Sequence, residues 1–306
     1  LRLPHDRRRH HVRPGGQADC KRRLVGRRLR PPYDDDSAST SGSVYVFRTT
    51  DGGVTYPQVA KLTASDASYD AEFGWSVAID SGTIVVGAYM KHTATLSYVG
   101  AAYVFRTSDG GATYDQVAKL TASDAAGDDQ FGRSVAIAGG TVVVGTSAKD
   151  SYTGAVYVFR TTDGGATYAE VAKLTAADAA SGDDFGISVA IAGDTIVVGT
   201  ENKEAAYVFR TTDGGATYVE VAKLTADDAA AIDQFGISVA IAGDTIVVGV
   251  DGDDDGGSAS GSAYVFRTTD GATYVEVAKL TADDAASIDQ FGGSVAIAGG
   301  TIVVGA

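Results

Sequence analysis

One unit of sequence recurs five times in this 306-residue chain, and this repetition limits the fold more than any other feature. The pair Phe-Gly marks each copy, and successive pairs begin 58, 54, 50 and 56 residues apart. Nearly all of that variation falls between a Val-Val-Gly triplet and the next Tyr-Val-Phe, where 15, 11, 7 and 14 residues intervene. A long fixed period is typical of solenoids and propellers. We therefore expect rigid repeats that each carry one variable surface loop.

Four segments of each unit have the pattern of β-strands. In one copy these are residues 207–209, 218–224, 236–241 and 245–248, which are short apolar or alternating runs separated by Gly/Asp turns. No segment has an apolar period of 3.6 residues long enough for a helix. The pattern predicts an all-β fold, a β-propeller of four-stranded antiparallel blades. The strand of small residues is expected at the centre and the strand with Glu and Lys at the rim.

The units are expected to form four complete blades with half-blades at both ends. The complete blades would cover residues 73–122, 131–176, 185–226 and 235–282, while the repeats enter at Tyr45 and end at Gly305. Two interpretations remain open at this stage. Either the two halves complete a fifth blade and close the propeller, or the chain is a fragment of a longer ring.

Charge divides the chain into two parts. Residues 1–33 contain 11 Lys and Arg against two acidic residues, whereas residues 34–306 contain 14 basic and 37 acidic residues. The acidic body excludes nucleic acid and anionic membranes as partners, and no apolar run is long enough to span a membrane. We interpret residues 1–33 as a basic segment that is disordered or translated out of frame, rather than as a nucleic-acid arm or a targeting peptide. Residues 34–306 would form the propeller.

The repeated order of Phe-Gly, Ser-Val-Ala-Ile and Ile-Val-Val-Gly-Ala resembles the FG-GAP repeats of integrin α-subunit propellers. It is more similar still to the FG-GAP repeats of bacterial and algal repeat proteins, over about residues 42–306. The resemblance implies a seven-bladed ring in an extracellular or cell-surface protein that serves adhesion or ligand binding. A protein or a glycan is the expected ligand, and the oligomeric state stays open.

The calcium loops of integrins are not carried over, because the corresponding hairpins here contain only Ala-Gly-Asp or Ala-Gly-Gly. A DxDxDG pattern does occur after the fourth Val-Val-Gly, with Asp251, Asp253, Asp255 and Gly256 in order. Alternating carboxylates can supply oxygen ligands to Ca²⁺, although position 12 of the pattern is Ser262 instead of a bidentate Glu. The loop is therefore either a Ca²⁺ site or a solvated acidic loop.

A second resemblance lies in the segment Thr-Thr-Asp-Gly-Gly-Ala-Thr-Tyr, which is similar to the Asp-box of sialidase-type propellers. Its aspartates are Asp51, Asp109, Asp163, Asp213 and Asp270, and the last copy lacks one glycine. Asp-boxes are structural hairpins, so the resemblance brings no sialidase chemistry with it. The arginines that recur once per blade (Arg48, Arg106, Arg160, Arg210 and Arg267) cannot converge on one site, and Arg133 is a lone exception.

Catalytic constellations are absent from the repeats. The only histidine there is His92, in a variable loop, and no phosphate-binding or dinucleotide motif occurs. An aspartate seven residues before each Phe-Gly (Asp66, Asp124, Asp178, Asp228 and Asp284) is interpreted as an Asx-turn or cap. We predict a non-catalytic extracellular binding or adhesion scaffold that uses the variable loops, chiefly residues 88–101 and 250–262. The alternatives are a carbohydrate-active propeller enzyme and a structural array without a specific ligand.

Overall fold

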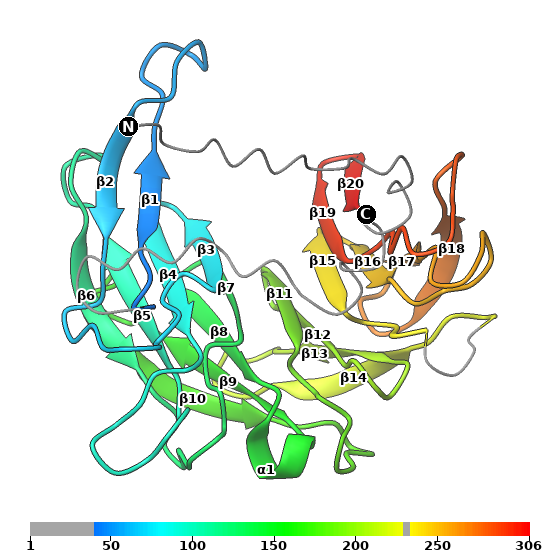
Figure 1. Ribbon diagram of the computed structural model, residues 1–306, viewed down its shortest axis with the longest axis horizontal. Coiled ribbons are helices and arrows are strands. Elements are labelled where there is room, and N and C mark those ends of the chain that lie inside the picture. Colours follow the sequence, from blue (N-terminus) through cyan, green and yellow to red (C-terminus); the bar gives the residue numbers. More distant parts are fainter. Residues whose placement is uncertain (1–39, 229–232) are drawn as a thin grey trace, which may run out of the picture. The chain divides into compact units, whose positions relative to one another are not determined.

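A computed structural model describes residues 40–228 and 233–306, and within them the fold is an all-β propeller of antiparallel blades (Figure 1). The first blade contains β3 (Ser76–Asp80), β4 (Thr83–Ala88), β5 (Ala101–Arg106) and β6 (Asp115–Leu120). The second contains β7 (Ser134–Ala138), β8 (Thr141–Thr146), β9 (Ala155–Arg160) and β10 (Ala169–Leu174). The third contains β11 (Ser188–Ala192), β12 (Thr195–Gly199), β13 (Ala206–Arg210) and β14 (Val219–Leu224). The fourth contains β15 (Ser238–Ala242), β16 (Thr245–Val250), β17 (Ser262–Thr268) and β18 (Tyr274–Leu280).

The strand order within each blade follows the sequence, as the repeat predicts. The first two strands of the fourth blade meet at a two-residue turn, because Ala242 pairs with Thr245 and Gly243 takes a φ of 57°. The second strand is buried along almost its whole length, since a neighbouring blade covers each of its faces. The outermost pair of strands contains a bulge, for example between Val208 and Phe209 of the third blade.

The strand of small residues lies innermost. Contacts join β3 to β7, β7 to β11, β11 to β15 and β15 to β19 (Ser294–Ala298). Between neighbouring blades lie apolar clusters, and the phenylalanine of Phe-Gly is central to each of them. Phe131, which is 1% exposed, meets the Phe159 ring of its own blade edge-on with 6.0 Å between centroids, and its cluster also contains Val85 and Val104 of the preceding blade. The Phe-Gly motif therefore holds successive blades together.

Each variable loop is attached to the blade that follows it. The loop after β4 ends at Gly100, which forms a parallel bridge with Phe131, and the Phe131 N–H donates to the carbonyl of Val99 at 3.0 Å. Gly100 has a φ of 81°, and a Cβ at this position would lie 2.0 Å from the Phe131 carbonyl oxygen, so glycine is required there. The loops and the Phe-Gly turns share one face of the propeller, which we name the loop face. The short hairpins and the Asp-box-like hairpins share the opposite face, the hairpin face.

The half-blades at the two ends remain separate sheets. One contains β1 (Val44–Phe47) and β2 (Gln58–Leu62), and the other contains β19 and β20 (Thr301–Gly305). They do not pair to complete a fifth blade, so the interpretation in which two halves close the propeller is not realised. As a result Phe47 is 57% exposed, whereas its counterpart Phe105 is 3% exposed.

Two further predictions concern helices and the N-terminal segment. One short helical turn, α1 (Lys149–Tyr152), occurs in the loop of the second blade, where no helix was expected. Within the described ranges, no helix is long and apolar enough to cross a membrane. The interpretation of residues 1–33 as a basic tail falls outside the described residues.

Candidate functional site

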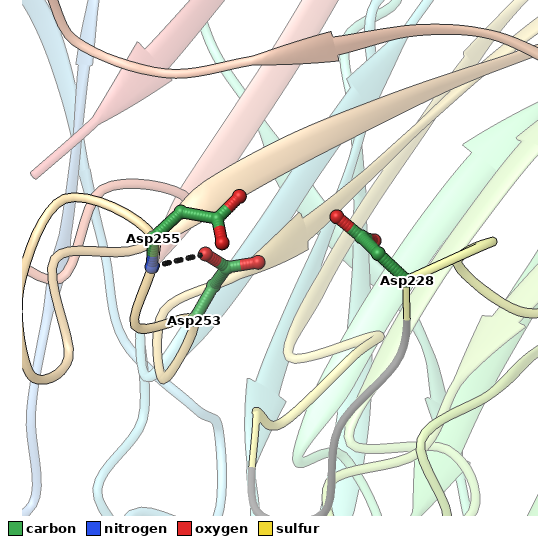
Figure 2. Close-up of side chains that lie close together, drawn as sticks. All are labelled: Asp228, Asp253 and Asp255. Atoms are coloured by element: carbon green, nitrogen blue, oxygen red, sulfur yellow. Dashed lines mark hydrogen bonds between the residues drawn. The ribbon is translucent and has the colours of Figure 1, made fainter.

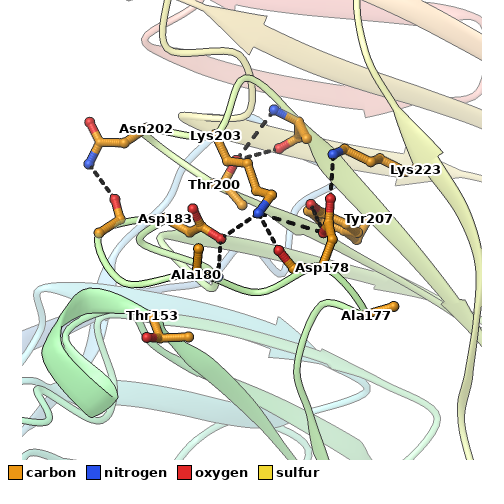
Figure 3. A network of polar contacts seen from close by, with 12 residues as sticks. Thr153, Ala177, Asp178, Ala180, Asp183, Thr200, Asn202, Lys203, Tyr207 and Lys223 are labelled. Atoms are coloured by element: carbon orange, nitrogen blue, oxygen red, sulfur yellow. Dashed lines mark hydrogen bonds and ion pairs between the residues drawn. The ribbon is translucent and has the colours of Figure 1, made fainter.

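Four of the aspartates that stand seven residues before a Phe-Gly are held by side chains of the blade that follows them. In the third blade the Asp178 carboxylate accepts a hydrogen bond from the Tyr207 hydroxyl at 2.6 Å and one from Lys223 Nζ at 2.7 Å (Figure 3). These two bonds lower the pKa of Asp178 to about 2. The same Tyr–Asp–Lys arrangement recurs in the other complete blades, with Asp66, Asp124 and Asp228. These aspartates therefore have a structural role, as predicted. Their carboxylates accept hydrogen bonds from Tyr and Lys side chains, however, where an Asx-turn with the backbone was expected.

A second lysine reaches this aspartate from the variable loop. It stands four residues after the Val-Val-Gly glycine in the first three blades, as Lys91, Lys149 and Lys203. Lys149 Nζ lies 2.8 Å from the carbonyl oxygen of Asp124 and 2.9 Å from the Asp129 carboxylate, and the side chains of Lys149 and Asp129 are 4% and 6% exposed. Lys203 makes the equivalent contacts in the third blade (Figure 3). The lysine thus ties the base of the loop to the blade.

The first blade differs because Ala71 stands where the second has Asp129. Lys91 is buried as deeply as Lys149, but its nearest carboxylate, that of Asp66, lies 3.5 Å away and is 43% exposed. Burial therefore lowers the pKa of Lys91. Burial acts in the same direction on Lys149, but Asp129 and Asp124 outweigh it, and the pKa of Lys149 is raised.

In the fourth blade the lysine of the loop is replaced by Asp253. The structure brings the carboxylates of Asp228, Asp253 and Asp255 together, with one oxygen from each within 4.8 Å of the others (Figure 2). Lys279 Nζ lies among them, at 2.7, 2.9 and 2.5 Å from Asp228, Asp253 and Asp255. These carboxylates and the Tyr264 hydroxyl outweigh burial and raise the pKa of Lys279.

Two of the three predicted metal ligands, Asp253 and Asp255, therefore belong to this acidic group. Asp251 does not, and Asp228 takes its place although it lies more than 20 residues earlier in the chain. This acidic triad could bind a metal ion. A linear motif could not reveal Asp228, because the blade and not the loop brings it to the group.

On the hairpin face, the Asp-box-like carboxylates are saturated by their own turns. Asp213 Oδ1 accepts the backbone N–H groups of Ala216 and Thr217 at 2.9 and 3.0 Å. The shortened copy keeps this arrangement, since Asp270 accepts from Ala272 and Thr273.

The recurring arginines cross to the hairpin of the next blade. Arg160 donates to the carbonyl of Gly214, and a Cβ at Gly215 would lie 2.8 Å from its guanidinium nitrogen. The same crossing brings Arg106 beside Gly165 and Arg210 beside Gly271. No link between blades was expected from these arginines, although an arginine and a glycine recur at fixed positions of the units.

The comparisons with known proteins agree with the repeat pattern. The model of the FG-GAP repeat matches five times, at residues 56–105, 114–159, 168–219, 218–266 and 274–306. The chain belongs to the FG-GAP repeat family. No curated protein matches this FG-GAP chain. Among solved structures it is similar to Saccharomyces cerevisiae Sqt1, at 13% identity and a TM-score of 0.48, over 86% of this chain and 63% of that one.

One group of side chains on the loop face departs from the FG-GAP repeat. The residue after Phe-Gly is Ile187 in the third blade and Ile237 in the fourth, but Trp75 in the first and Arg133 in the second. The Arg133 guanidinium carbon lies 5.0 Å from the centre of the Trp75 ring system and 4.9 Å from that of Tyr89. Arg133 stands out in the sequence as an arginine that does not recur, but its pairing with Trp75 depends on the packing of two blades.

Proposed function

We propose that this FG-GAP propeller is a non-catalytic binding or adhesion scaffold, extracellular or at the cell surface, whose loop face contacts a protein or glycan ligand. One observation carries the proposal: nearly all of the length variation between repeats falls in the loops of that face, and contacts with the blades hold the ends of these loops. In the first three blades a lysine ties the start of the loop to its own blade. A glycine ties the end of the first, second and fourth loops to the next Phe-Gly turn, and in the third loop Glu204 accepts the Phe235 N–H instead. Rigid elements that present variable loops are a common basis for recognition.

A non-catalytic role is supported by the way the repeated polar groups are used. The Asp-box-like carboxylates accept backbone N–H groups, and the recurring arginines serve neighbouring hairpins. Neither set is available to a substrate. Hydrolysis of a panel of chromogenic glycosides, including a sialoside, would contradict the proposal and favour the carbohydrate-active alternative.

A loop exchange tests the binding function. Residues 200–206 form the shortest loop, and they keep a lysine at the fourth position, as Lys203. Placing this segment where residues 88–102 stand preserves the attachment to Asp66 and removes only the variable part. The same exchange at residues 146–156 is the matched control for a shortened loop. Binding to an array of secreted proteins and glycans should be lost after the exchange at residues 88–102 and kept after the exchange at residues 146–156. Unchanged binding after exchange of every loop would refute the use of this face.

We also propose that the acidic triad of the fourth blade binds Ca²⁺. The favouring observation is the replacement of a loop lysine by Asp253, which adds a carboxylate where the other blades place an ammonium group. Three carboxylates supply hard oxygen ligands of the kind that Ca²⁺ prefers. The ion would have to displace Lys279, so a Lys279→Met variant should bind Ca²⁺ more tightly than the wild type.

Calorimetry with CaCl₂ measures this directly. Asp253→Asn should abolish the binding heat, while Asp251→Asn should leave it unchanged, because Asp251 lies outside the triad. If neither the wild type nor Lys279→Met produces heat, the metal proposal is wrong and Lys279 is the cation that this group was built to hold.

A further inference from the structure

The strongest departure from repeat symmetry lies where the first three blades meet on the loop face. Trp75 precedes β3, Tyr89 follows β4 and Arg133 precedes β7, so the first two blades both contribute. The rings of Trp75 and Tyr89 lie 4.8 Å apart, and the Arg133 guanidinium contacts both of them. Arg133 thus orders an aromatic pair that no other blade possesses.

The two aromatic residues are held differently. Tyr89 is 4% exposed, and burial together with a hydrogen bond to Glu72 raises the pKa of its hydroxyl. Trp75 is only partly buried, so part of its indole ring system faces solvent. Because Tyr89 is buried and the Trp75 ring packs against it, the exposed part of Trp75 is held in place at the surface.

Polar groups of the third blade continue the cluster beyond Arg133. Asp184 is near enough for the Arg133 charge to act on its carboxyl, and Asn202 donates to it at 2.5 Å. Asn202 also donates to the carbonyl of Gly182 at 3.0 Å, which fixes the amide. The cluster therefore combines an aromatic surface with fixed hydrogen-bonding groups of both kinds.

We infer that Trp75, Arg133 and Asp184 form a binding site for a neutral saccharide. A pyranose ring has an apolar face of C–H groups and an edge of hydroxyls that both donate and accept hydrogen bonds. The indole ring suits the first of these, and the indole N–H, the carboxylate of Asp184 and the carbonyl oxygen of the Asn202 amide suit the second. This inference rests on the proposed binding function and deepens it, since it names the site and the ligand class.

The charges of the cluster favour a neutral ligand over a charged one. The Arg133 guanidinium already lies beside both aromatic rings, so a basic peptide would meet repulsion at the same place. An anionic sugar would meet Glu72 and Asp184 and the strongly acidic surface of the propeller. A ligand without net charge avoids both penalties.

The repeat itself supplies the variants that test the site. Trp75→Ile and Arg133→Ile introduce the residue that the third and fourth blades carry at this position, so the fold should be kept. Ile237→Val is the matched control, at the same repeat position outside the cluster. The probes are the methyl glycosides of glucose, galactose, mannose and N-acetylglucosamine, together with a tetralysine peptide.

Two readouts are combined. Trp75 is the only tryptophan of the chain, so its fluorescence reports binding in the wild type, and saturation-transfer NMR reports binding in every variant. At least one glycoside should shift the emission, and Trp75→Ile and Arg133→Ile should weaken its binding about two- to tenfold, because stacking contributes about that factor. Ile237→Val should bind as the wild type does.

The inference is overturned if no glycoside binds, if both isoleucine variants bind as well as the wild type, or if only the peptide perturbs Trp75. None of these results touches the proposed binding function, which accepts a protein ligand. That function fails separately, when exchange of the loops leaves all array binding unchanged.

Discussion

Removal of the Lys149 ammonium group should destabilise the propeller far more than the same change at Lys91. In Lys149→Met the Asp129 carboxylate, 6% exposed, keeps its charge and loses its partner at 2.9 Å. An uncompensated buried charge of this kind costs about 3–5 kcal/mol in the free energy of unfolding. In Lys91→Met the remaining Asp66 is 43% exposed and still paired with Lys119, so the cost should stay within about 1 kcal/mol.

Thermal and urea unfolding followed by circular dichroism at pH 7 measure the difference. For a domain of this size about 1 kcal/mol corresponds to roughly 3 °C, so Lys149→Met should melt roughly 10 °C below the wild type. The double variant Lys149→Met with Asp129→Asn keeps an acceptor for the Ala126 N–H and removes the buried charge, so it should recover most of the loss. Equal melting of the two single variants would refute the reasoning, because burial of the partner carboxylate would then not decide the cost.

Three further predictions follow from the same contacts. Asp184→Asn should match the wild type near pH 4 and be more stable by about 1–2 kcal/mol at pH 7. Burial and Glu201 raise the pKa of Asp184 to about 6, so its ionisation between those pH values costs stability. Urea titrations at both pH values check this. The pKa of Asp178 is lowered to about 2, so its ionised carboxylate stabilises the fold at pH 7, by under about 1 kcal/mol because the site is half-exposed. This stabilisation should disappear as the pH falls from about 4 to 2, and comparison with Asp178→Asn across that range measures it. Tyr207→Phe should cost about 1 kcal/mol in urea unfolding at pH 7, because it removes the hydroxyl donor to Asp178, and no loss would mean that Lys223 satisfies the carboxylate alone.

The repeat predicted the blades because strand patterns and turn residues are local properties. The strand order, the inner position of the small-residue strand and the hairpin at Gly243 all follow from the period and from residue type. The two half-blades do not pair to complete a fifth blade, which was one of the two interpretations. Similar sequence alone does not bring the edges of two distant half-blades together. The helical turn at α1 depends on loop closure and has no periodic signal.

The candidate sites could be predicted only where their residues are neighbours in the sequence. Asp253 and Asp255 came from a linear motif, whereas Asp228 enters the acidic triad through the packing of its blade. The loop lysines had a usable signal, a fixed offset of four residues after a glycine in three blades. That signal was hidden because the loops otherwise share neither length nor composition.

Comparison of the repeats with one another separates scaffold from function in this chain. Residues that every blade shares make contacts that stabilise the scaffold, as the Tyr–Asp–Lys contacts and the arginine crossings illustrate. Where one blade differs, the scaffold does not dictate the residue, and another requirement has to account for it. Those differences gather on the loop face, at Trp75 and Arg133 in the first two blades and at Asp253 in the fourth. Because isoleucine and lysine satisfy the fold at the same positions elsewhere, substitution toward them tests function with little risk to stability.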